Sequence, residues 1–242
     1  MMLRLSLATP DGAMAVRAFV PTGAPRGGVI FYMDAFGLRP EFDGLCARYA
    51  AEGWLTLLPD LYHRLPRRSF PVPPDAAGLL DPAMNVANLA TTLPMSVADT
   101  ATVLAEAARH FGVTRFGAVG TCMGARHALA AAAAWPEAVR AAACLHGGRM
   151  VWEGPDSPHL LIPGLRGGLY LALARDDETC PEAHQQILER MVREAGPRAE
   201  AERYDALHGW TFPERWCHDR AAAAHAFAKA SALLESYVEA AR

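Results

Sequence analysis

Short, continuous runs of apolar residues recur along this chain, and most are followed by a stretch with the composition of a helix. Such runs fit strands buried on both faces, because a strand with one solvated face would alternate apolar and polar residues. Parallel strands need crossover connections, which are usually helices. The alternation predicts an α/β fold with a mostly parallel central sheet and helices on both faces. Its expected strands span residues 28–33, 54–58, 116–119, 141–145, 169–174 and 199–204.

The segments between these strands supply a hairpin, helices and a cover. Residues 1–22 alternate apolar and polar positions around a Pro-Asp-Gly turn, which indicates an edge hairpin. Prolines crowd residues 63–95, a segment too long for a plain connection, so we expect it to cover the active site with room for one short helix. We find no repeat or linker and expect a single domain over residues 1–242. Helices are expected at 40–52, 96–110 (capped by Ser96), 125–134, 181–195 and 216–241.

Composition excludes several classes of protein. The 242 residues carry a formal net charge of -3, without a basic run interleaved with aromatics, so we expect no nucleic-acid partner. The longest low-polarity stretch, residues 128–135, is too short to cross a membrane, and the first residues do not resemble a signal peptide. Five cysteines without paired spacing argue against a disulfide framework or a zinc site. We expect a cytoplasmic protein, a monomer or homodimer, with free thiols.

The strongest local motif is Gly-Thr-Cys-Met-Gly at residues 120–124, between an expected strand and an expected helix. In this pattern a nucleophile occupies a cramped turn, and the flanking glycines allow the strand and the helix to approach closely. The helix N-terminus lowers the pKa of a thiol and stabilises negative charge nearby. Cys122 is therefore our candidate nucleophile. The alternative is a small buried core cysteine.

A candidate acid and a candidate base follow in the order nucleophile, acid, histidine. Asp177 lies in the loop after the strand at 169–174, where it can accept the Nδ1 proton of a histidine and stabilise imidazolium. Asp176 is the alternative acid. His208 follows the last expected strand and is our candidate base. His127 lies within a helix and His146 ends a strand, where it could line the pocket.

With these residues in place, the chain resembles the dienelactone hydrolase family, the carboxymethylenebutenolidases and their relatives. The resemblance implies an α/β-hydrolase fold and hydrolysis of small-molecule esters or lactones by a Cys–His–Asp triad without a cofactor or a metal. It extends over most of the chain, and its specific marks are the motifs at residues 58–62, 120–124, 177–181 and 208–210.

The resemblance also implies roles for the residues after the first buried strand. In the family a glutamate at this place contacts the resting thiol, and this chain has Asp34 there. A carboxylate near the thiol would raise the thiol pKa by repulsion between like charges. The alternative role for Asp34 is to cap a turn. We expect the oxyanion hole to consist of the backbone N–H groups of Ala35 and Met123.

Substrate contacts are expected to depart from the family pattern. Family members that cleave dienelactone hold its carboxylate with arginines, one of them four residues after the histidine, where this chain has Phe212. We expect Trp210 and Phe212 to form an apolar rim and, with Phe36, to contact a less charged ester or lactone. Arginines of the covering segment are possible replacements, namely Arg64, Arg67 and Arg68.

The predicted reaction begins with attack of the Cys122 thiolate on an ester carbonyl. His208 protonates the leaving alkoxide and then activates water to cleave the thioester. Two other interpretations remain open at this stage. The chain could bind a small ligand without turnover, or it could sense oxidants through a disulfide between Cys122 and Cys180.

Overall fold

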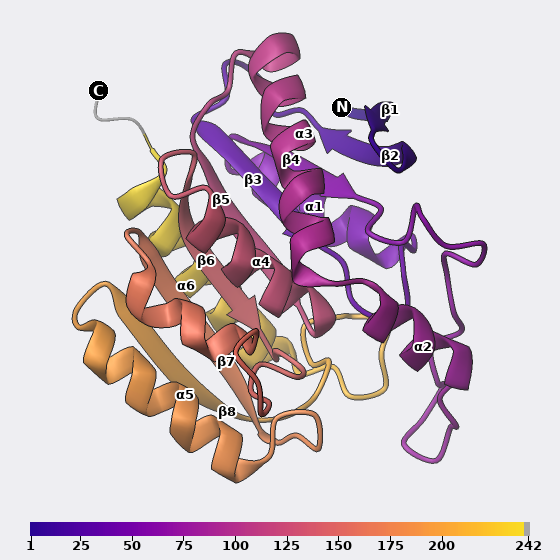
Figure 1. Cartoon of the computed structure of the whole chain (residues 1–242), viewed down its shortest axis with the longest axis vertical. Helices are drawn as coiled ribbons and strands as arrows, with labels where there is room; N and C mark the ends of the chain where they lie inside the picture. The colour runs from indigo at the N-terminus through magenta and orange to yellow at the C-terminus, as the bar shows by residue number, and fades with distance from the viewer. Residues whose placement is uncertain (240–242) are drawn as a thin grey trace.

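A computed structural model describes residues 1–239 of the chain. Its eight strands form one sheet in the order β1-β2-β4-β3-β5-β6-β7-β8 (Figure 1). The first two strands form the antiparallel edge hairpin that the sequence predicts, and the six strands from β3 to β8 run parallel. The strands are β1 (Met2–Thr9), β2 (Gly12–Phe19), β3 (Gly27–Tyr32), β4 (Trp54–Pro59), β5 (Phe116–Thr121), β6 (Val139–Leu145), β7 (Gly168–Asp176) and β8 (Ala199–Leu207).

Helices cover both faces of this sheet, which confirms the predicted fold class. One face is packed by α3, α4 and α5, which lie in front of the sheet in Figure 1, and the other by α1 and α6. All residues of β3, β4 and β5 are buried, as expected of strands covered on both sides. The helices are α1 (Glu41–Ala51), α2 (Pro82–Ala90), α3 (Leu93–Phe111), α4 (Met123–Ala134), α5 (Glu182–Ala195) and α6 (Arg220–Tyr237).

The start of α3 corrects the sequence-based expectation. Thr92, rather than Ser96, is the N-cap, and its side chain accepts a hydrogen bond from the backbone N–H of Met95. Pro94 is compatible with the first turn of a helix, because the N–H that proline lacks has no intrahelical partner there. The hydroxyl of Ser96 donates to the carbonyl of Leu93 within that turn. The first residues of α3 therefore lie within the proline-rich segment 63–95, which the sequence analysis assigned to the cover.

The last helix also begins later than expected. Asp219 caps α6 and accepts a hydrogen bond from the N–H of Ala222 at 2.9 Å, so residues 216–219 precede the helix. The expected end at residue 241 lies outside the described residues. A short 3₁₀ helix at Pro158–Gly164 was not expected, because Pro163 interrupts any helical pattern there.

The proline-rich segment contains one short helix, as expected. Asp81 caps α2 by accepting the N–H of Ala83 at 2.9 Å, and Pro82 occupies its first turn. In Figure 1, α2 and the loop before it project beyond the edge of the sheet near the start of α3. Within residues 1–239, no helix combines the length and the apolar character that a membrane crossing requires.

Candidate active site

Cys122 lies in a strained turn between β5 and α4. Its backbone has φ 54° and ψ -116°, a combination that residues with a side chain rarely adopt. A Cβ atom at Gly120 would lie 2.1 Å from the carbonyl oxygen of Gly124, and one at Gly124 would lie 2.1 Å from that of Tyr32. Both glycines are therefore required by close backbone approach. This packing puts the N-terminus of α4 and Cys122 beside the end of β3.

His208 and Asp177 meet at the end of the neighbouring strands β7 and β8. The Nδ1 atom of His208 lies 2.6 Å from one carboxylate oxygen of Asp177. The other oxygen accepts hydrogen bonds from the backbone N–H and the hydroxyl of Thr179, at 2.8 and 2.7 Å. Burial raises the pKa of Asp177, but these hydrogen bonds outweigh burial and lower it below the ordinary value. Asp176 is exposed, whereas Asp177 contacts the histidine.

The Cys122 thiol and the His208 imidazole interact. Burial raises the pKa of Cys122, but the positive charge of His208 outweighs burial and lowers it below the ordinary value. Burial lowers the pKa of His208, but the Cys122 charge and the hydrogen bond to Asp177 outweigh burial and raise it to about 10. Both directions favour a thiolate beside an imidazolium. The Nε2 atom of His208 is buried and has no well-aligned hydrogen-bond partner among residues 1–239.

Asp34 forms a buried ion-pair cluster at the end of β3. Its carboxylate binds the guanidinium of Arg39 through both oxygens, and the distance from Arg39 Nη2 to Asp34 Oδ2 is 2.9 Å. The same carboxylate also binds Arg215. One oxygen accepts the backbone N–H of Phe36 at 2.9 Å, which is the turn contact considered above. No hydrogen bond joins Asp34 to Cys122 in the described part of the chain, yet its charge raises the thiol pKa while that of Arg215 lowers it.

Trp210 and Phe212 do not form the expected rim. Both side chains are completely buried. The chain turns inward after His208 at Gly209, whose φ is 96°, and the indole of Trp210 packs against the ring of His146 with centroids 5.0 Å apart. Trp210 and Phe212 both pack against His146, and the ring of His146 packs against that of His208. Phe36 is also largely buried, with 7% exposure.

His127 and His146 are both completely buried. The Nδ1 atom of His127 lies 2.7 Å from the hydroxyl oxygen of Ser96. The Nε2 atom of His146 lies 2.8 Å from the hydroxyl oxygen of Thr211. Burial lowers the pKa of both histidines, so both are neutral at pH 7. The ring centroids of His146 and His208 lie 5.0 Å apart, so His146 is a packing partner of the candidate base.

Each of the three arginines of the covering segment is paired with at least one carboxylate. Arg64 binds Asp99 and Asp11, Arg67 binds Asp81, and Arg68 lies 3.6 Å from Asp60.

Arg126, on α4, is buried, and no carboxylate among residues 1–239 contacts it. It donates to the backbone carbonyl and side-chain oxygen of Asn88 on α2, at 2.9 and 2.6 Å, while its Nη1 atom has no partner within the described chain. Burial lowers the pKa of Arg126 to about 10. Its charge interacts favourably with that of Cys122 and unfavourably with that of Arg149. The sequence signal was the four-residue spacing from Cys122, about one helical turn.

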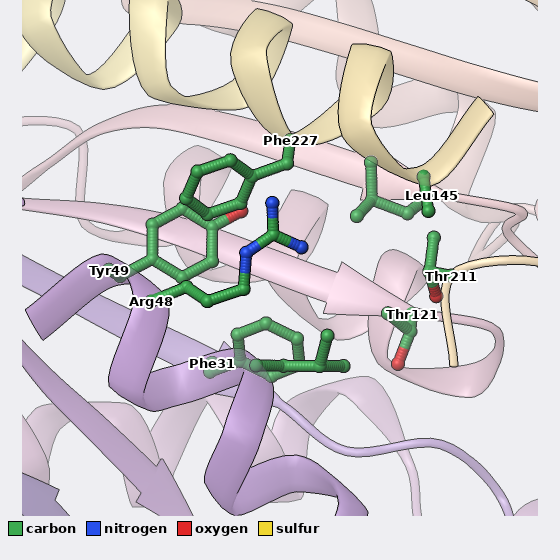
Figure 2. Close-up of a pocket in the computed structure, with 9 residues that line it drawn as sticks. Phe31, Arg48, Tyr49, Thr121, Leu145, Thr211 and Phe227 are labelled. Atoms are coloured by element: carbon green, nitrogen blue, oxygen red, sulfur yellow. The ribbon is translucent and has the colours of Figure 1, made fainter. Parts of the chain in front are cut away.

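A small cavity lies on the face of the sheet that α1 and α6 cover. Thr121 and Thr211, next to the Cys122 turn and the His208 loop, line one end of it, and Tyr49 and Phe227 line the other (Figure 2). Its volume of about 20 Å³ is close to that of one solvent-sized sphere, so it cannot hold an ester substrate. Within residues 1–239, no group of three or more histidine, cysteine or acidic side chains is arranged to hold a metal ion.

Comparison with known protein families decides what kind of protein carries this site. The family model described as the dienelactone hydrolase family matches residues 14–238. The chain belongs to the dienelactone hydrolase family. Membership makes it a carboxylic ester hydrolase acting on small molecules, and it confirms the resemblance inferred from the motifs. No curated protein sequence matches the chain.

Solved structures show the same fold at low sequence identity. A protein from Klebsiella pneumoniae subsp. pneumoniae MGH 78578, assigned as a dienelactone hydrolase, is 22% identical, with a TM-score of 0.85 and coverage of 98% of this chain and 99% of that one. A dienelactone hydrolase-like promiscuous phosphotriesterase from metagenomic libraries is 18% identical, with a TM-score of 0.74 and coverage of 98% and 99%. Thermogutta terrifontis esterase 2, phosphoramylated by tabun, is 16% identical, with a TM-score of 0.72 and coverage of 97% and 94%.

The first prediction concerns Asp34. Asp34→Asn leaves Arg39 and Arg215 without their buried acid, so the free energy of unfolding should fall by about 3–5 kcal/mol. The same change removes a charge that raises the thiol pKa, so the alkylation profile of Cys122 with iodoacetamide should shift to lower pH. Denaturant titration and alkylation rates against pH measure the two effects.

Asp43→Asn is the matched control, because Asp43 pairs with Arg17 in a more exposed ion pair. Asp43→Asn should lower the free energy of unfolding by less than about 1 kcal/mol and leave the alkylation profile of Cys122 unchanged. An Asp34→Asn enzyme with lower stability and the wild-type alkylation profile would restrict Asp34 to a structural role.

Proposed function

We propose that this dienelactone hydrolase family member cleaves small-molecule esters or lactones through a thioester on Cys122, with His208 as the base and Asp177 as the acid that orients it. The observation that carries the proposal is the 2.6 Å contact between His208 Nδ1 and Asp177, beside a thiol whose pKa His208 lowers. Thr179 occupies the second oxygen of Asp177, which leaves the first for the histidine.

Acylation starts from the thiolate. The Cys122 sulfur attacks the ester carbonyl carbon, and the carbonyl π electrons move to oxygen to give a tetrahedral oxyanion. The oxyanion accepts hydrogen bonds from the N–H groups of Ala35 and Met123. When it collapses, the carbon–oxygen bond to the alcohol breaks and imidazolium His208 gives its proton to the alkoxide.

Deacylation reverses these roles. Neutral His208 takes a proton from water, and the hydroxide adds to the thioester carbonyl carbon. Collapse breaks the carbon–sulfur bond and releases the carboxylic acid, which restores the thiolate–imidazolium pair. Asp177 stabilises imidazolium in both halves and keeps the Nε2 atom directed at the sulfur.

Cys180 supports this hydrolase assignment over a redox role. A resolving cysteine must be accessible as a thiolate to attack an oxidised partner. Cys180 is 2% exposed, and burial raises the pKa of its thiol to about 12. A Cys122–Cys180 disulfide is therefore disfavoured by the chemistry of the second thiol.

Arg126 bears on the charge of the substrate. A buried guanidinium without a counter-ion is costly, and an anion on a bound substrate would compensate it. Its free Nη1 atom and its electrostatic coupling to Cys122 favour an ester that carries a carboxylate. This replaces the sequence-based preference for a less charged substrate, which depended on Phe212 and on a rim that is buried.

The nucleophile is tested by Cys122→Ala. This variant should fold normally and lose hydrolysis of an activated aryl ester by several orders of magnitude, because no other group forms the acyl intermediate. Cys217→Ala is the control for a partly buried thiol, and it should retain wild-type turnover. Steady-state rates and the burst of phenol release provide the measurement. Retention of more than about a tenth of the activity by Cys122→Ala would refute the assignment.

The acid is tested by a pair of neighbouring substitutions. Asp177→Asn should lower kcat by about 10²–10⁴, because imidazolium loses its stabilising charge and the histidine tautomer is no longer controlled. Asp176→Asn should change kcat by less than about twofold, since Asp176 is exposed at the end of β7 and Asp177 holds the histidine. Circular dichroism checks folding, and a reversed order of the two effects would exchange the two residues' roles.

The substrate charge is tested with Arg126→Gln. For an ester whose acyl group ends in a carboxylate, kcat/KM should fall about 10- to 100-fold, the range expected for loss of a hydrogen-bonded charge pair. The methyl ester of the same terminal carboxylate should lose less than about threefold. Asn88→Ala removes the contact to α2 but keeps the guanidinium, so it should not change the preference. Equal losses of kcat/KM for the two esters would mean that Arg126 does not bind the substrate carboxylate and serves only to attach α2 to α4.

A further inference from the structure

Tyr62 lies between the two halves of the predicted oxyanion hole. It follows β4 in a turn closed by Asp60, whose carboxylate accepts the backbone N–H of Tyr62 at 3.0 Å. The side chain is completely buried, and its ring packs edge-on against Phe70, with centroids 6.0 Å apart. The backbone and the ring of Tyr62 are therefore both fixed by contacts, so the hydroxyl has a defined position.

The Tyr62 hydroxyl contacts both residues whose N–H groups would bind the oxyanion. It donates to the carbonyl of Ala35 at 2.9 Å and lies 3.3 Å from the sulfur of Met123. A phenol has one proton, and a carbonyl oxygen is a stronger acceptor than a thioether. The proton therefore goes to Ala35, and Met123 packs against the oxygen.

This hydrogen bond completes the fixation of the Ala35 backbone. The peptide group between Ala35 and Phe36 is held at its oxygen by Tyr62 and at its N–H by the Asp34 carboxylate. The preceding peptide is held at the Asp34 carbonyl by the N–H of Gly37, at 3.2 Å. Its own N–H, that of Ala35, has no protein partner among the described residues and is available to a substrate.

We infer that Tyr62 is a positioning residue for the oxyanion hole: its hydroxyl fixes the direction of the Ala35 N–H and holds Ala35 against Met123. The inference rests on the proposed function, since it concerns the transition state of that reaction. Preorganised donors stabilise an oxyanion because they need not reorient when charge develops. A donor that moves by a fraction of an ångström loses part of that stabilisation.

The test is Tyr62→Phe, which removes only the oxygen. The kcat for an activated ester should fall about 10- to 30-fold, less than the 10²–10³ expected when a donor is lost entirely, while KM stays within about twofold. Inhibition by a small aldehyde, which forms a tetrahedral hemithioacetal with Cys122, should weaken by a similar factor. Alkylation of Cys122 by iodoacetamide forms no oxyanion, so its rate should stay within about twofold of wild type.

Tyr32→Phe is the matched control. Tyr32 is equally buried, and its hydroxyl bonds Thr100 at 2.7 Å on α3, so the change deletes a comparable hydrogen bond away from Ala35. It should leave kcat, aldehyde inhibition and alkylation at wild-type values. Rates are normalised to the phenol burst, so a partly unfolded sample is not read as slow chemistry.

Two results would overturn the inference. In one, Tyr62→Phe keeps kcat within about twofold of wild type. In the other, it lowers alkylation as much as turnover, which would mean that the thiol itself is disturbed. Both differ from failure of the proposed function, which Cys122→Ala reveals by retaining activity.

Discussion

The close approach of α4 to the end of β3 is the constraint on which the rest of the site depends. Helix and strand meet backbone to backbone at Gly124, where a Cβ atom would collide with the carbonyl of Tyr32. A Cβ atom at Gly120 would collide with Gly124 in the turn between β5 and α4. Cys122, in the turn that precedes this contact, has a positive φ. The approach also brings the first N–H groups of α4 beside the turn after β3. The proposed nucleophile and the proposed oxyanion donors therefore lie at one packing contact between two elements.

Charge is distributed around this contact so that almost every buried ion has a counter-ion. Asp34 holds two arginines, and Asp177 holds His208, which in turn favours thiolate on Cys122. Buried charges are tolerated when they are paired and hydrogen-bonded, and they are costly otherwise. Arg126 departs from this pattern, since its contacts are to neutral oxygens of Asn88. The carboxylate of the substrate that we propose would supply the counter-ion that Arg126 lacks.

The sequence predicts the parts of this molecule that depend on local pattern. Apolar runs located the central strands, and the glycine spacing around Cys122 located the turn, because buried strands and tight turns restrict residue type directly. The sequence left Asp176 as the alternative to Asp177, and the 2.6 Å contact between Asp177 and His208 favours Asp177. Partners far apart in the chain were not predictable: 181 residues separate Asp34 from Arg215, and nothing local marks that pair. The burial of Trp210 and Phe212 was missed for the same reason, since the turn at Gly209 sends them into the core.

The ion pair between Asp34 and Arg215 has a consequence for the motions of the histidine loop. Residues 209–219 connect the last strand to α6, and a surface connection of this kind ordinarily opens at little cost. Here Arg215 is fastened to the end of a central strand, and its guanidinium lies over the ring of Phe212, 4.4 Å from its centroid. Opening the loop would expose the rings of Trp210 and Phe212 and remove one of the two arginines that bind the Asp34 carboxylate. The amides of Trp210 and Phe212 should consequently exchange with solvent more slowly than those of an ordinary surface connection.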